Sequence, residues 1–559
     1  MLFSRLIGQE TEYAIRFSPE RRRPGNDTIY EALASAIGEQ VRTEPGMFPE
    51  RPQIFLQNGG AFHYEYLPYR ADGGLIEGAT PECRGPAQLL VYQRAQESLL
   101  LKSMARAEAI LRASGCPGRL GLLKNCKDAE GHVYGAQESF EVEAASGASL
   151  WLYRAGLVLL TPLLALTVAA GWGTVIALAP VVIVAALLWT VAVVALPPRR
   201  RVWFEGLVTR NDRSFENRVG RWLYWLSYVI TWPFIVSLSL LLRCLVFSRM
   251  RRELTAFLVS RAVLSGAGSV EADGRFVLSE KGPSIRRLWR HSISPNDRAI
   301  FDVGNLMKPA LSAAHFYLMP LAGLFQPKQR LQLGLADSNV LDEAEFLKMG
   351  TTALVVDMVE AGRARNLPRV KRPVRALHAI VSDPALSVKV PTTRGEMSAL
   401  EIQRTYLDEA KSFVRDSKPT SLEARTVVRL WEDVLLALEK GEQDRLVGRI
   451  DWVTKRYLLE ACGGPGTDQR LKTIDLRYHE IGDGYAARLV GSGHARKLIS
   501  QEEVEHATTE PPIGTPAFAR GRFIRERRTS LVPVRVAWDA ARIGGRLHGK
   551  IVRFPGSNG

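Results

Sequence analysis

The longest apolar stretch of the chain covers residues 155–198, which are 44 consecutive residues without Asp, Glu, Lys, Arg or His. A helix that crosses a bilayer needs about 20 apolar residues, so this stretch is long enough for two crossings. The Gly-Trp-Gly sequence at 171–173 is a suitable turn between them. The pattern predicts a membrane hairpin. The alternative is a pair of buried core helices, which so long a stretch without charge disfavours.

Basic residues flank this hairpin. Arg154 precedes it, and Arg199, Arg200 and Arg201 follow it. Lys and Arg accumulate in the cytoplasmic segments next to membrane helices. We therefore expect a multi-pass membrane protein in which both ends of the hairpin, and the domain attached to them, are cytoplasmic.

A second apolar stretch covers 222–242, contains Pro233 and ends at Arg243. A third crossing would place the chain before 150 and the chain after 250 on opposite sides of the bilayer. If those two parts form one domain, the number of crossings is even. We then expect 222–242 to be interfacial or re-entrant, and its aromatic residues are typical of an interface: Trp222, Tyr224, Trp225, Tyr228 and Trp232.

The chain on either side of the apolar stretches has the patterns of a mixed α and β domain. Short runs of β type occur on both sides, at 54–66 around an Asn-Gly-Gly turn, 120–126, 134–143 and 330–339. Helical periodicity occurs at 87–114, 254–264, 343–362, 398–417, 420–440 and 443–461. After about residue 485 the sequence becomes basic and irregular, which indicates a small separate C-terminal domain.

Composition narrows the class of protein. The 559 residues are 24% charged and 46% hydrophobic, which is typical of a globular protein. The bulk of the chain therefore does not consist of membrane-spanning helices. The net charge is +16, but no nucleic-acid motif is present, and basic residues such as Arg249, Arg251 and Arg252 gather beside the apolar stretches. A membrane is therefore the expected anionic partner, not a nucleic acid. Five cysteines without a CxxC pair, and an N-terminus without a signal-peptide pattern, indicate a reducing compartment.

Carboxylates recur at alternate positions of the expected strands. Residues two apart on a strand point to the same face of the sheet. Several carboxylates on one face favour a hard divalent cation such as Mg²⁺, which could carry nucleotide phosphates. The alternative is an ordinary solvated face. The candidates are Glu10 with Glu12, His63 with Glu65, Glu77 with Glu82, and Glu138 with Glu141.

The sequences of these segments, and their order along the chain, resemble the Pup ligase and depupylase (Pup deamidase) family of the proteasome accessory factor A type. This family belongs to the glutamine-synthetase-like carboxylate–amine ligases. The resemblance is carried by LIGQETEY, NGGAFHYEY, EGATPEC and LLKNCKDAEGHVYGAQESF before the apolar stretches. After them it is carried by AFLVSRAVLSGAG, LADSN, LKMGTTALVVDMVEAG, SALEIQRTYLDEA, IDWVTKR, IDLRYHEI, EPPIGTPAFARGRFI and VAWD.

The resemblance implies an α+β fold in which a glutamine-synthetase-like antiparallel sheet packs with helices. It implies one catalytic domain, 1–143 and 253–485, that is split by a transmembrane α-helical insertion at 144–252. Within the insertion we expect the hairpin at about 155–198 and the interfacial or re-entrant element at 222–242. Residues 486–559 would form the small C-terminal domain.

The resemblance also implies roles for individual residues. Mg²⁺ would be held by Glu10, His63 and Glu77, and ATP by Thr80 and Trp538. Glu65 would be the catalytic carboxylate, and Glu12 and Glu138 are further candidates for the site.

Several of these positions depart from the family pattern. Ala61 replaces an ATP-contacting Arg, His63 replaces a Tyr, and Glu65 replaces an Asp. Gln137 and Ser139 stand where the family has His and Asn around Glu138. The family's TRDEPHAD stretch has no counterpart, and FDVGNLMKP stands near that place. The longer side chain of Glu65 moves its carboxylate, to which catalysis is sensitive.

The implied activity is that of an ATP- and Mg²⁺-dependent ligase acting at the membrane. It would form an isopeptide bond between the C-terminal Glu of a small ubiquitin-like protein or peptide and a Lys of a protein substrate. The alternatives are a depupylase-like amide hydrolase and a degenerate descendant that only binds. A gap of 47 residues from Glu12 to Asn58 and the segment IDWVTKR resemble the ligases, whereas HAIVSDPAL and AWDAARIGG resemble the hydrolases.

Overall fold

The computed structural model describes most of the chain. The described residues are 2–48, 52–66, 73–143, 145–195, 222, 225–226, 229–290, 298–304, 306, 319–419, 421–464, 466, 468–527, 532–545 and 548–554. Arg199, Arg200, Arg201, Tyr224 and Tyr228, which entered the membrane prediction, lie outside these residues.

The centre of the molecule is a sheet of 11 strands. Its pairs are antiparallel except for β11 with β12. The spatial order is β11 (Arg287–Trp289), β12 (Ala299–Asp302), β13 (Lys328–Leu333), β8 (Gln137–Glu143), β1 (Leu6–Pro19), β5 (Gly74–Ala79), β4 (Ala61–Tyr66), β3 (Gln53–Leu56) and β2 (Thr43–Pro45), with β6 (Cys83–Arg84) and β7 (Gly118–Leu123) also on β1.

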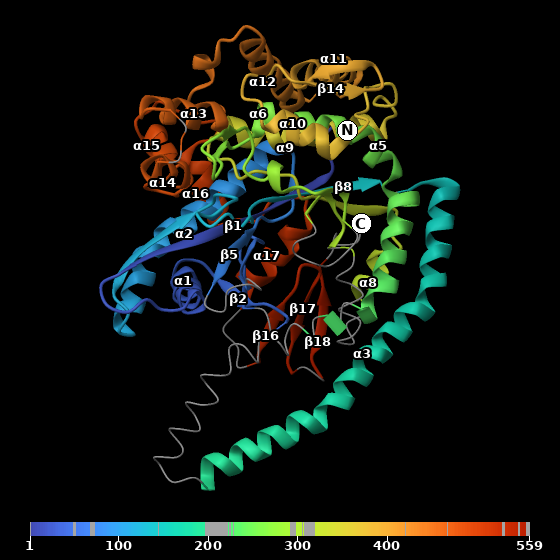
Figure 1. Cartoon of the computed structure of the whole chain (residues 1–559). Coiled ribbons are helices and arrows are strands. Elements are labelled where there is room, and N and C mark those ends of the chain that lie inside the picture. Colours follow the sequence, from blue (N-terminus) through green and yellow to red (C-terminus); the bar gives the residue numbers. More distant parts are fainter. Residues whose placement is uncertain are drawn as a thin grey trace.

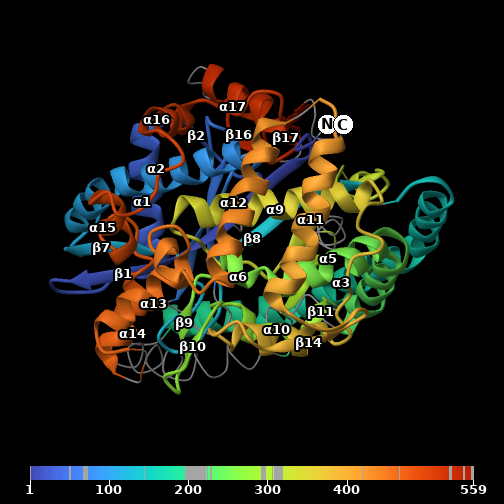
Figure 2. The same ribbon diagram turned by 90° about the horizontal axis from the view of Figure 1, so that it is seen from above.

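Helices cover one face of this sheet. Along β1, Gln9, Thr11 and Tyr13 are buried on that face, whereas Glu10 and Glu12 alternate with them and point to the opposite face. The covering helices include α2 (Pro86–Ala113), α5 (Ser248–Ser260) and α9 (Asp342–Glu360). Figure 1 has α9 to α12 on one side of the sheet and β16–β18 on the other, and Figure 2 gives the view from above.

The remaining helices pack around these elements. They are α1 (Asn26–Gln40), α6 (Ala262–Ser265), α8 (Met319–Gly323), α10 (Pro373–Val381), α11 (Ala399–Asp416), α12 (Leu422–Glu439), α13 (Asp451–Ala461), α14 (Gln469–Arg477), α15 (Tyr485–Gly491), α16 (Gln501–Thr509) and α17 (Pro516–Glu526). Three short ribbons complete the fold: β9 (Ser269–Val270) with β10 (Phe276–Val277), β14 (Lys389–Thr392) with β15 (Gly395–Ser398), and β16 (Val534–Val536), β17 (Ala540–Ile543) and β18 (Lys550–Arg553).

Most of the predicted elements are confirmed within a few residues, and one helix is wrong. The sequence predicts a single helix over 443–461. The structure has a 3-10 turn at Gln443–Leu446 and starts α13 only at Asp451. Gly448 between them has a φ of 77°, and a Cβ there would lie 2.1 Å from the carbonyl oxygen of His494. A close approach in a left-handed conformation ends the helical pattern at this glycine. The boundary of the C-terminal domain at 486 stays a prediction.

The two parts of the chain on either side of the insertion share the central sheet. β8 lies before the insertion and β13 after it, and the two pair from Lys328 with Glu143 to Leu333 with Glu138. Behind this pair, Arg261 makes two ion-paired hydrogen bonds to Glu138, at 2.6 and 2.8 Å, with both side chains buried. One core therefore contains residues from before and after the insertion.

The first apolar stretch forms one helix, α3 (Gly147–Ala195), so the predicted turn at 171–173 is absent. In this helix nothing lies within 4 Å of where a Cβ would be on Gly171 or Gly173, so no tertiary contact forces a turn. At 1.5 Å per residue, 49 residues extend about 74 Å, more than twice the hydrocarbon thickness of a bilayer. In Figure 1, α3 runs away from the body of the molecule.

Two described helices, Gly147–Pro180 and Val229–Val246, have the length and apolar composition that crossing a membrane requires. The second is attached to the body of the protein, because Phe234, Ile235 and Leu238 are buried in the main core. Ser239 accepts a hydrogen bond of 2.9 Å from the indole of Trp289. These contacts hold one face of the helix against the protein.

A substitution of Arg261 tests the buried pair that joins the two halves. Arg261→Met leaves the carboxylate of Glu138 buried without its partner, so we expect the free energy of unfolding to fall by about 3–5 kcal/mol. The matched control, Arg404→Met, removes a partly exposed pair with Glu439 and should cost about 0–1 kcal/mol. Denaturant unfolding of the full chain in detergent measures both.

The double variant Arg261→Met with Glu138→Leu should recover most of the loss, because it buries no unpaired charge. A double variant as unstable as Arg261→Met alone would contradict this interpretation.

Candidate active site

Three ionisable side chains lie in a row across the open face of the sheet. Glu12 on β1 is opposite Glu77 on β5, and Glu77 is opposite His63 on β4. Directly opposed residues of antiparallel strands project to the same face. Nε2 of His63 is 3.0 Å from Oε2 of Glu77 and 3.8 Å from Oε2 of Glu65. The register thus brings together side chains that are far apart in the sequence.

The cluster of His63, Glu65 and Glu77 has the composition of a divalent cation site. One ligand atom from each lies within 4.8 Å of the others. Glu77 is buried and Glu65 is about half exposed, so the site opens to solvent on one side. Nδ1 of His63 is buried without a described hydrogen-bond partner. Carboxylates gathered this closely are stabilised by a cation, so the residues fit the predicted metal.

The imidazole widens the choice of metal. Mg²⁺ prefers oxygen ligands, whereas imidazole binds later divalent metals better, so a site of one His and carboxylates suits Mn²⁺ at least as well as Mg²⁺. Glu10 lies two residues from Glu12 on the same face and is opposite Ala79, one step along the sheet from the cluster. It could extend the site toward bound phosphates.

Proton affinities are shifted in this cluster. Burial, followed by the charge of Glu77, raises the pKa of Glu12 to about 8, although Lys281 and a 2.8 Å hydrogen bond from the amide of Gly135 oppose the shift. Burial lowers the pKa of His63, but the carboxylates of Glu77, Glu65 and Glu10 outweigh it and the net pKa is raised. Both groups therefore hold protons that a cation would displace.

A pocket of about 370 Å³ adjoins Glu10 on the open face. Thr80 and Trp538, the predicted ATP-binding residues, both line it. The hydroxyl of Thr80 accepts a 3.0 Å hydrogen bond from the amide of Gln9, which leaves its proton available to a ligand. The indole of Trp538 packs edge-on against Phe55, with ring centres 5.2 Å apart. The structure thus places both residues beside the candidate metal site.

Arg520 positions Trp538, and the sequence analysis did not identify it. The Arg520 side chain is fully buried and lies 4.6 Å from the centre of the Trp538 ring. It donates hydrogen bonds to the Trp538 carbonyl at 2.6 Å and to the Gly59 carbonyl at 2.7 Å, and pairs with Glu82 at 2.5 Å. Glu82 is therefore paired with Arg520 and lies outside the cluster of His63, Glu65 and Glu77. The segment that contains Arg520 matched the family, but only the fold reveals its partners.

Arg330 is the second residue that the sequence did not reveal. It lies on β13 opposite Glu141, in the same pocket, and its guanidinium is 2.7 Å from Oε1 of Glu10 and 2.9 Å from Oγ of Ser139. Its side chain is 42% exposed, so it can turn toward a ligand. It places a planar cation, which is suited to phosphate, beside the metal site. Ala61, which stands where the family has an ATP-contacting Arg, is buried.

The structure does not support Glu138 as a site residue. Gln9 is opposite Glu138, so Glu138 points to the buried face, where Arg261 neutralises it. Its neighbours Gln137 and Ser139 point to the open face instead: Gln137 is opposite Glu10 and bonds to Gln332. Because successive side chains on a strand point to opposite faces, Gln137 and Ser139 face away from Glu138. Of FDVGNLMKP, residues 305 and 307–309 lie outside the described part of the chain.

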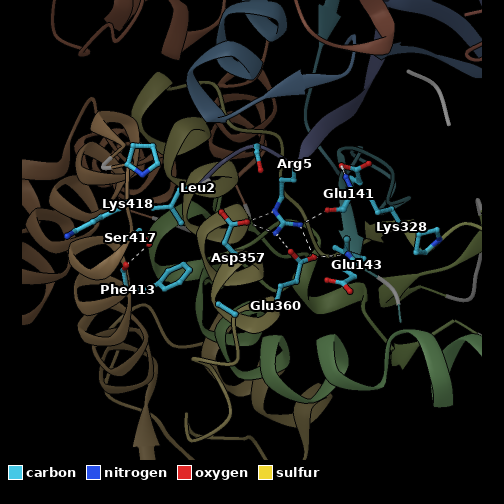
Figure 3. A pocket seen from close by; sticks show the side chains of 15 residues that line it. Leu2, Arg5, Glu141, Glu143, Lys328, Asp357, Glu360, Phe413, Ser417 and Lys418 are labelled. Atoms are coloured by element: carbon cyan, nitrogen blue, oxygen red, sulfur yellow. Dashed lines mark hydrogen bonds and ion pairs between the residues drawn. The ribbon is translucent and has the colours of Figure 1, made fainter. Parts of the chain in front are cut away.

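A larger cavity, of about 670 Å³, shares Glu141 and Lys328 with the first pocket. Figure 3 shows Arg5 at its centre, directed between Asp357 and Glu360. Arg5 is 2.5 Å from Oδ1 of Asp357 and 2.7 Å from Oε2 of Glu360. Because these ion pairs neutralise Arg5, its main role is to attach the first residues of the chain to the end of α9.

The pKa shifts predict that proton release accompanies cation binding. The raised pKa of His63 means that protons compete with a metal below it, so affinity for Mn²⁺ or Mg²⁺ should rise as pH increases, by up to about tenfold per unit for each displaced proton. Calorimetry at several pH values, in buffers of different ionisation enthalpy, counts the protons. Glu12→Gln should remove the dependence near pH 8, and Glu39→Gln, on the surface of α1, should not. Affinity independent of pH would contradict the cluster.

Comparison with known proteins adds the family. A sequence model described as Pup-ligase protein matches residues 5–542. The Pup–protein ligases of Acidimicrobium ferrooxidans and Pseudarthrobacter chlorophenolicus are each 25% identical to this chain, over 545 and 558 residues; these cover 96% and 98% of this chain and 92% and 95% of the relatives.

Solved structures have the same fold. The ligase PafA in complex with the prokaryotic ubiquitin-like protein Pup matches with a TM-score of 0.67 and 20% identity, over 100% of this chain and 90% of that one. PafA in complex with ADP matches with a TM-score of 0.61 and 19% identity, over 97% and 95%. The predicted α+β fold is confirmed. The predicted class of enzyme, an ATP-dependent ligase, is confirmed at the level of the family, and this chain belongs to the Pup-ligase protein family.

Proposed function

We propose that this protein joins the C-terminal Glu of a small ubiquitin-like modifier to a Lys amine of a protein substrate, using ATP, at a membrane. The observation that carries the proposal is that Glu10, two residues along β1 from the row of Glu12, Glu77 and His63, lines the pocket of Thr80 and Trp538. The relatives are Pup–protein ligases, and PafA structures contain Pup or ADP. A cation next to a nucleotide pocket is the arrangement that phosphoryl transfer requires.

The first step is activation of the modifier's carboxylate. That carboxylate attacks the γ-phosphorus of ATP, the bond to the β-phosphate oxygen breaks, and ADP and an acyl phosphate form. A divalent cation, when bound, neutralises the phosphate charge. Arg330 adds positive charge to the same side of the site, and Thr80 and Trp538 orient the nucleotide.

The second step forms the isopeptide bond. The Lys amine attacks the acyl carbon, inorganic phosphate leaves, and the amine loses a proton. Glu65 suits that proton transfer because it lies at the solvent-facing end of the cluster, 3.8 Å from His63. Glutamate in place of aspartate moves the carboxylate outward along the exposed end of β4, where there is room for it.

Substitution of Glu65 tests the catalytic role. Glu65→Gln keeps the size of the side chain but cannot accept a proton, so we expect conjugation to fall by about 10²–10⁴-fold. Because Glu65 also belongs to the cation cluster, ATP binding is compared at saturating divalent cation, where it should stay within about threefold. The assay measures Mg²⁺- or Mn²⁺-dependent ATP turnover and conjugate formation by the full chain with a small protein that ends in Glu. Glu44→Gln, on the last strand of the sheet, β2, is the control.

Each result identifies one class of protein. No ATP binding by the wild type would rule out an enzyme, and equal turnover by Glu65→Gln would rule out Glu65 as the base. Hydrolysis of a side-chain amide to ammonia, or release of the modifier from a conjugate, would favour the hydrolase.

Membrane attachment is supported by the two apolar helices and by the way they join the body. The first turns of α3 and the segment Val229–Val246 pack against each other, since a Cβ on Gly156 would lie 2.5 Å from Leu241. Both ends of the insertion thus meet the same body. Residues 196–221 carry ten charged side chains, which are costly to place in hydrocarbon. Because both ends of the insertion meet one body, the number of crossings would be even.

We therefore propose a multi-pass arrangement with a cytoplasmic catalytic domain. In lipid, α3 and Val229–Val246 would each cross the bilayer once, which returns both ends of the insertion to the cytoplasmic side.

Cysteine labelling tests this topology. A cysteine at position 171 (Gly171→Cys) should react with an impermeant maleimide only from the outer side, and Cys462, exposed on the catalytic body, only from the cytoplasmic side. Intact cells and inverted vesicles give the two directions. Because Cys244 is also exposed, Cys244→Ser is present throughout, and Cys462→Ser is added to isolate the first site. Reaction of both positions from the cytoplasmic side would mean that α3 lies in the plane of the membrane.

A further inference from the structure

Three arginines gather where the membrane insertion joins the catalytic body. Arg243 lies in a π-helical turn, Leu242–Val246, at the end of the second apolar helix, and Arg251 and Arg252 lie in the first turn of α5. Arg252 is exposed and the other two are half-buried. None of the three has an acidic partner among the residues that the structure describes.

Their charges act on one another. The turn Leu242–Val246, which carries Arg243, packs against α5, which carries the other two. Burial lowers the pKa of Arg251, and Arg243 and Arg252 lower it further, although Cys244 opposes the shift. Nε of Arg251 is buried and has no described hydrogen-bond partner. Arg249 nearby differs, because it lies 3.6 Å from Glu253 and donates to the Glu360 carbonyl. Three uncompensated cations at one place form a site for an external anion.

The surroundings of the cluster are apolar. Leu240, on the preceding helix, exposes 46% of its surface, and Trp151, on the adjacent first turn of α3, exposes 70%. At the opposite end of the same apolar segment, Trp222, Trp225 and Trp232 are exposed. Arginines at one end of an apolar helix and tryptophans at the other are typical of a segment at a bilayer surface. In Figure 1, α5 lies beside the start of α3.

We propose that Arg243, Arg251 and Arg252 bind the phosphate of an anionic lipid headgroup. This inference rests on the proposed membrane attachment and adds a specific lipid class to it. Guanidinium groups bind phosphate oxygens in pairs, and the apolar surface beside them accommodates acyl chains, which a free phosphate or a nucleic acid would not use. None of the three arginines lines the nucleotide pocket or the cavity around Arg5, so the site is separate from catalysis.

Bound lipid would fix how the catalytic body sits on the membrane. α5 packs on α9 under the central sheet, and α3 leaves the sheet directly after β8. A headgroup held at the start of α5 therefore restrains the body at a second point besides the apolar helices. The open face of the sheet, with the active site, would then keep one orientation relative to the bilayer.

The test uses the full chain in nanodiscs that contain phosphatidylcholine alone or an equal mixture with phosphatidylglycerol. Native mass spectrometry after release from the mixed nanodiscs counts the lipids retained. We expect the wild type to retain phosphatidylglycerol over phosphatidylcholine by on the order of 100-fold, about fivefold for each arginine. The variant Arg243→Gln, Arg251→Gln, Arg252→Gln should lose this preference and keep its ATP turnover.

A matched variant controls for net charge. Arg119, Arg425 and Arg429 are exposed and have no partner among the described residues, so their replacement by Gln removes the same charge elsewhere. This variant should retain the wild-type preference. If the first variant does not fold, Arg252→Glu, a change at an exposed position, carries the test and should reduce the preference at least fivefold.

The outcomes separate the two proposals. A wild type that enters phosphatidylcholine nanodiscs but shows no preference, or a preference that survives the Arg→Gln variant, overturns the lipid site alone. Loss of the preference in excess inorganic phosphate at constant ionic strength assigns the site to free phosphate and also overturns it. A full chain that enters no nanodisc overturns membrane attachment itself.

Discussion

The pairing of β8 with β13 is the contact on which the rest of the structure depends. The two strands are separated in sequence by the whole insertion, and their six paired positions join the two parts of the central sheet. The Arg261 and Glu138 pair stabilises the same junction from the buried side. Because the sheet is continuous across the insertion, Arg330 on β13 can reach Glu10 on β1, and the apolar helices must return to the body from which they start.

On the open face of this sheet, carboxylates lie close enough to repel one another. The register aligns Glu12, Glu77 and His63, and burial keeps water from screening them. Without a cation the cluster holds protons, as the pKa of about 8 at Glu12 indicates. Carboxylates arranged in this way cost folding free energy that a metal and nucleotide recover on binding. Active sites commonly lower the stability of the folded protein in this way.

The C-terminal part of the chain contributes to the site through one buried arginine. Arg520 connects the Asn-Gly turn before β4, Glu82 after β5 and the Trp538 ring. Replacement of the family's arginine by Ala61 is compatible with this arrangement, because Ala61 is buried with Phe55 and residues of the small sheet β16–β18. Arg330 on β13 supplies the positively charged side chain next to the phosphates instead.

The sequence alone determined the elements, the family and most of the candidate site. Alternation along the strands placed Glu10 with Glu12 and His63 with Glu65 on one face, since side-chain direction follows directly from strand geometry. The charge-free stretch located the apolar segment that forms α3. Register between distant strands is not local information, so only the tertiary structure could place Glu77 beside His63, turn Glu138 to the buried face and give Glu82 to Arg520. Likewise, the helical pattern could not show whether α3 turns at its glycines, because glycine permits a turn and only contacts or a surrounding bilayer enforce one.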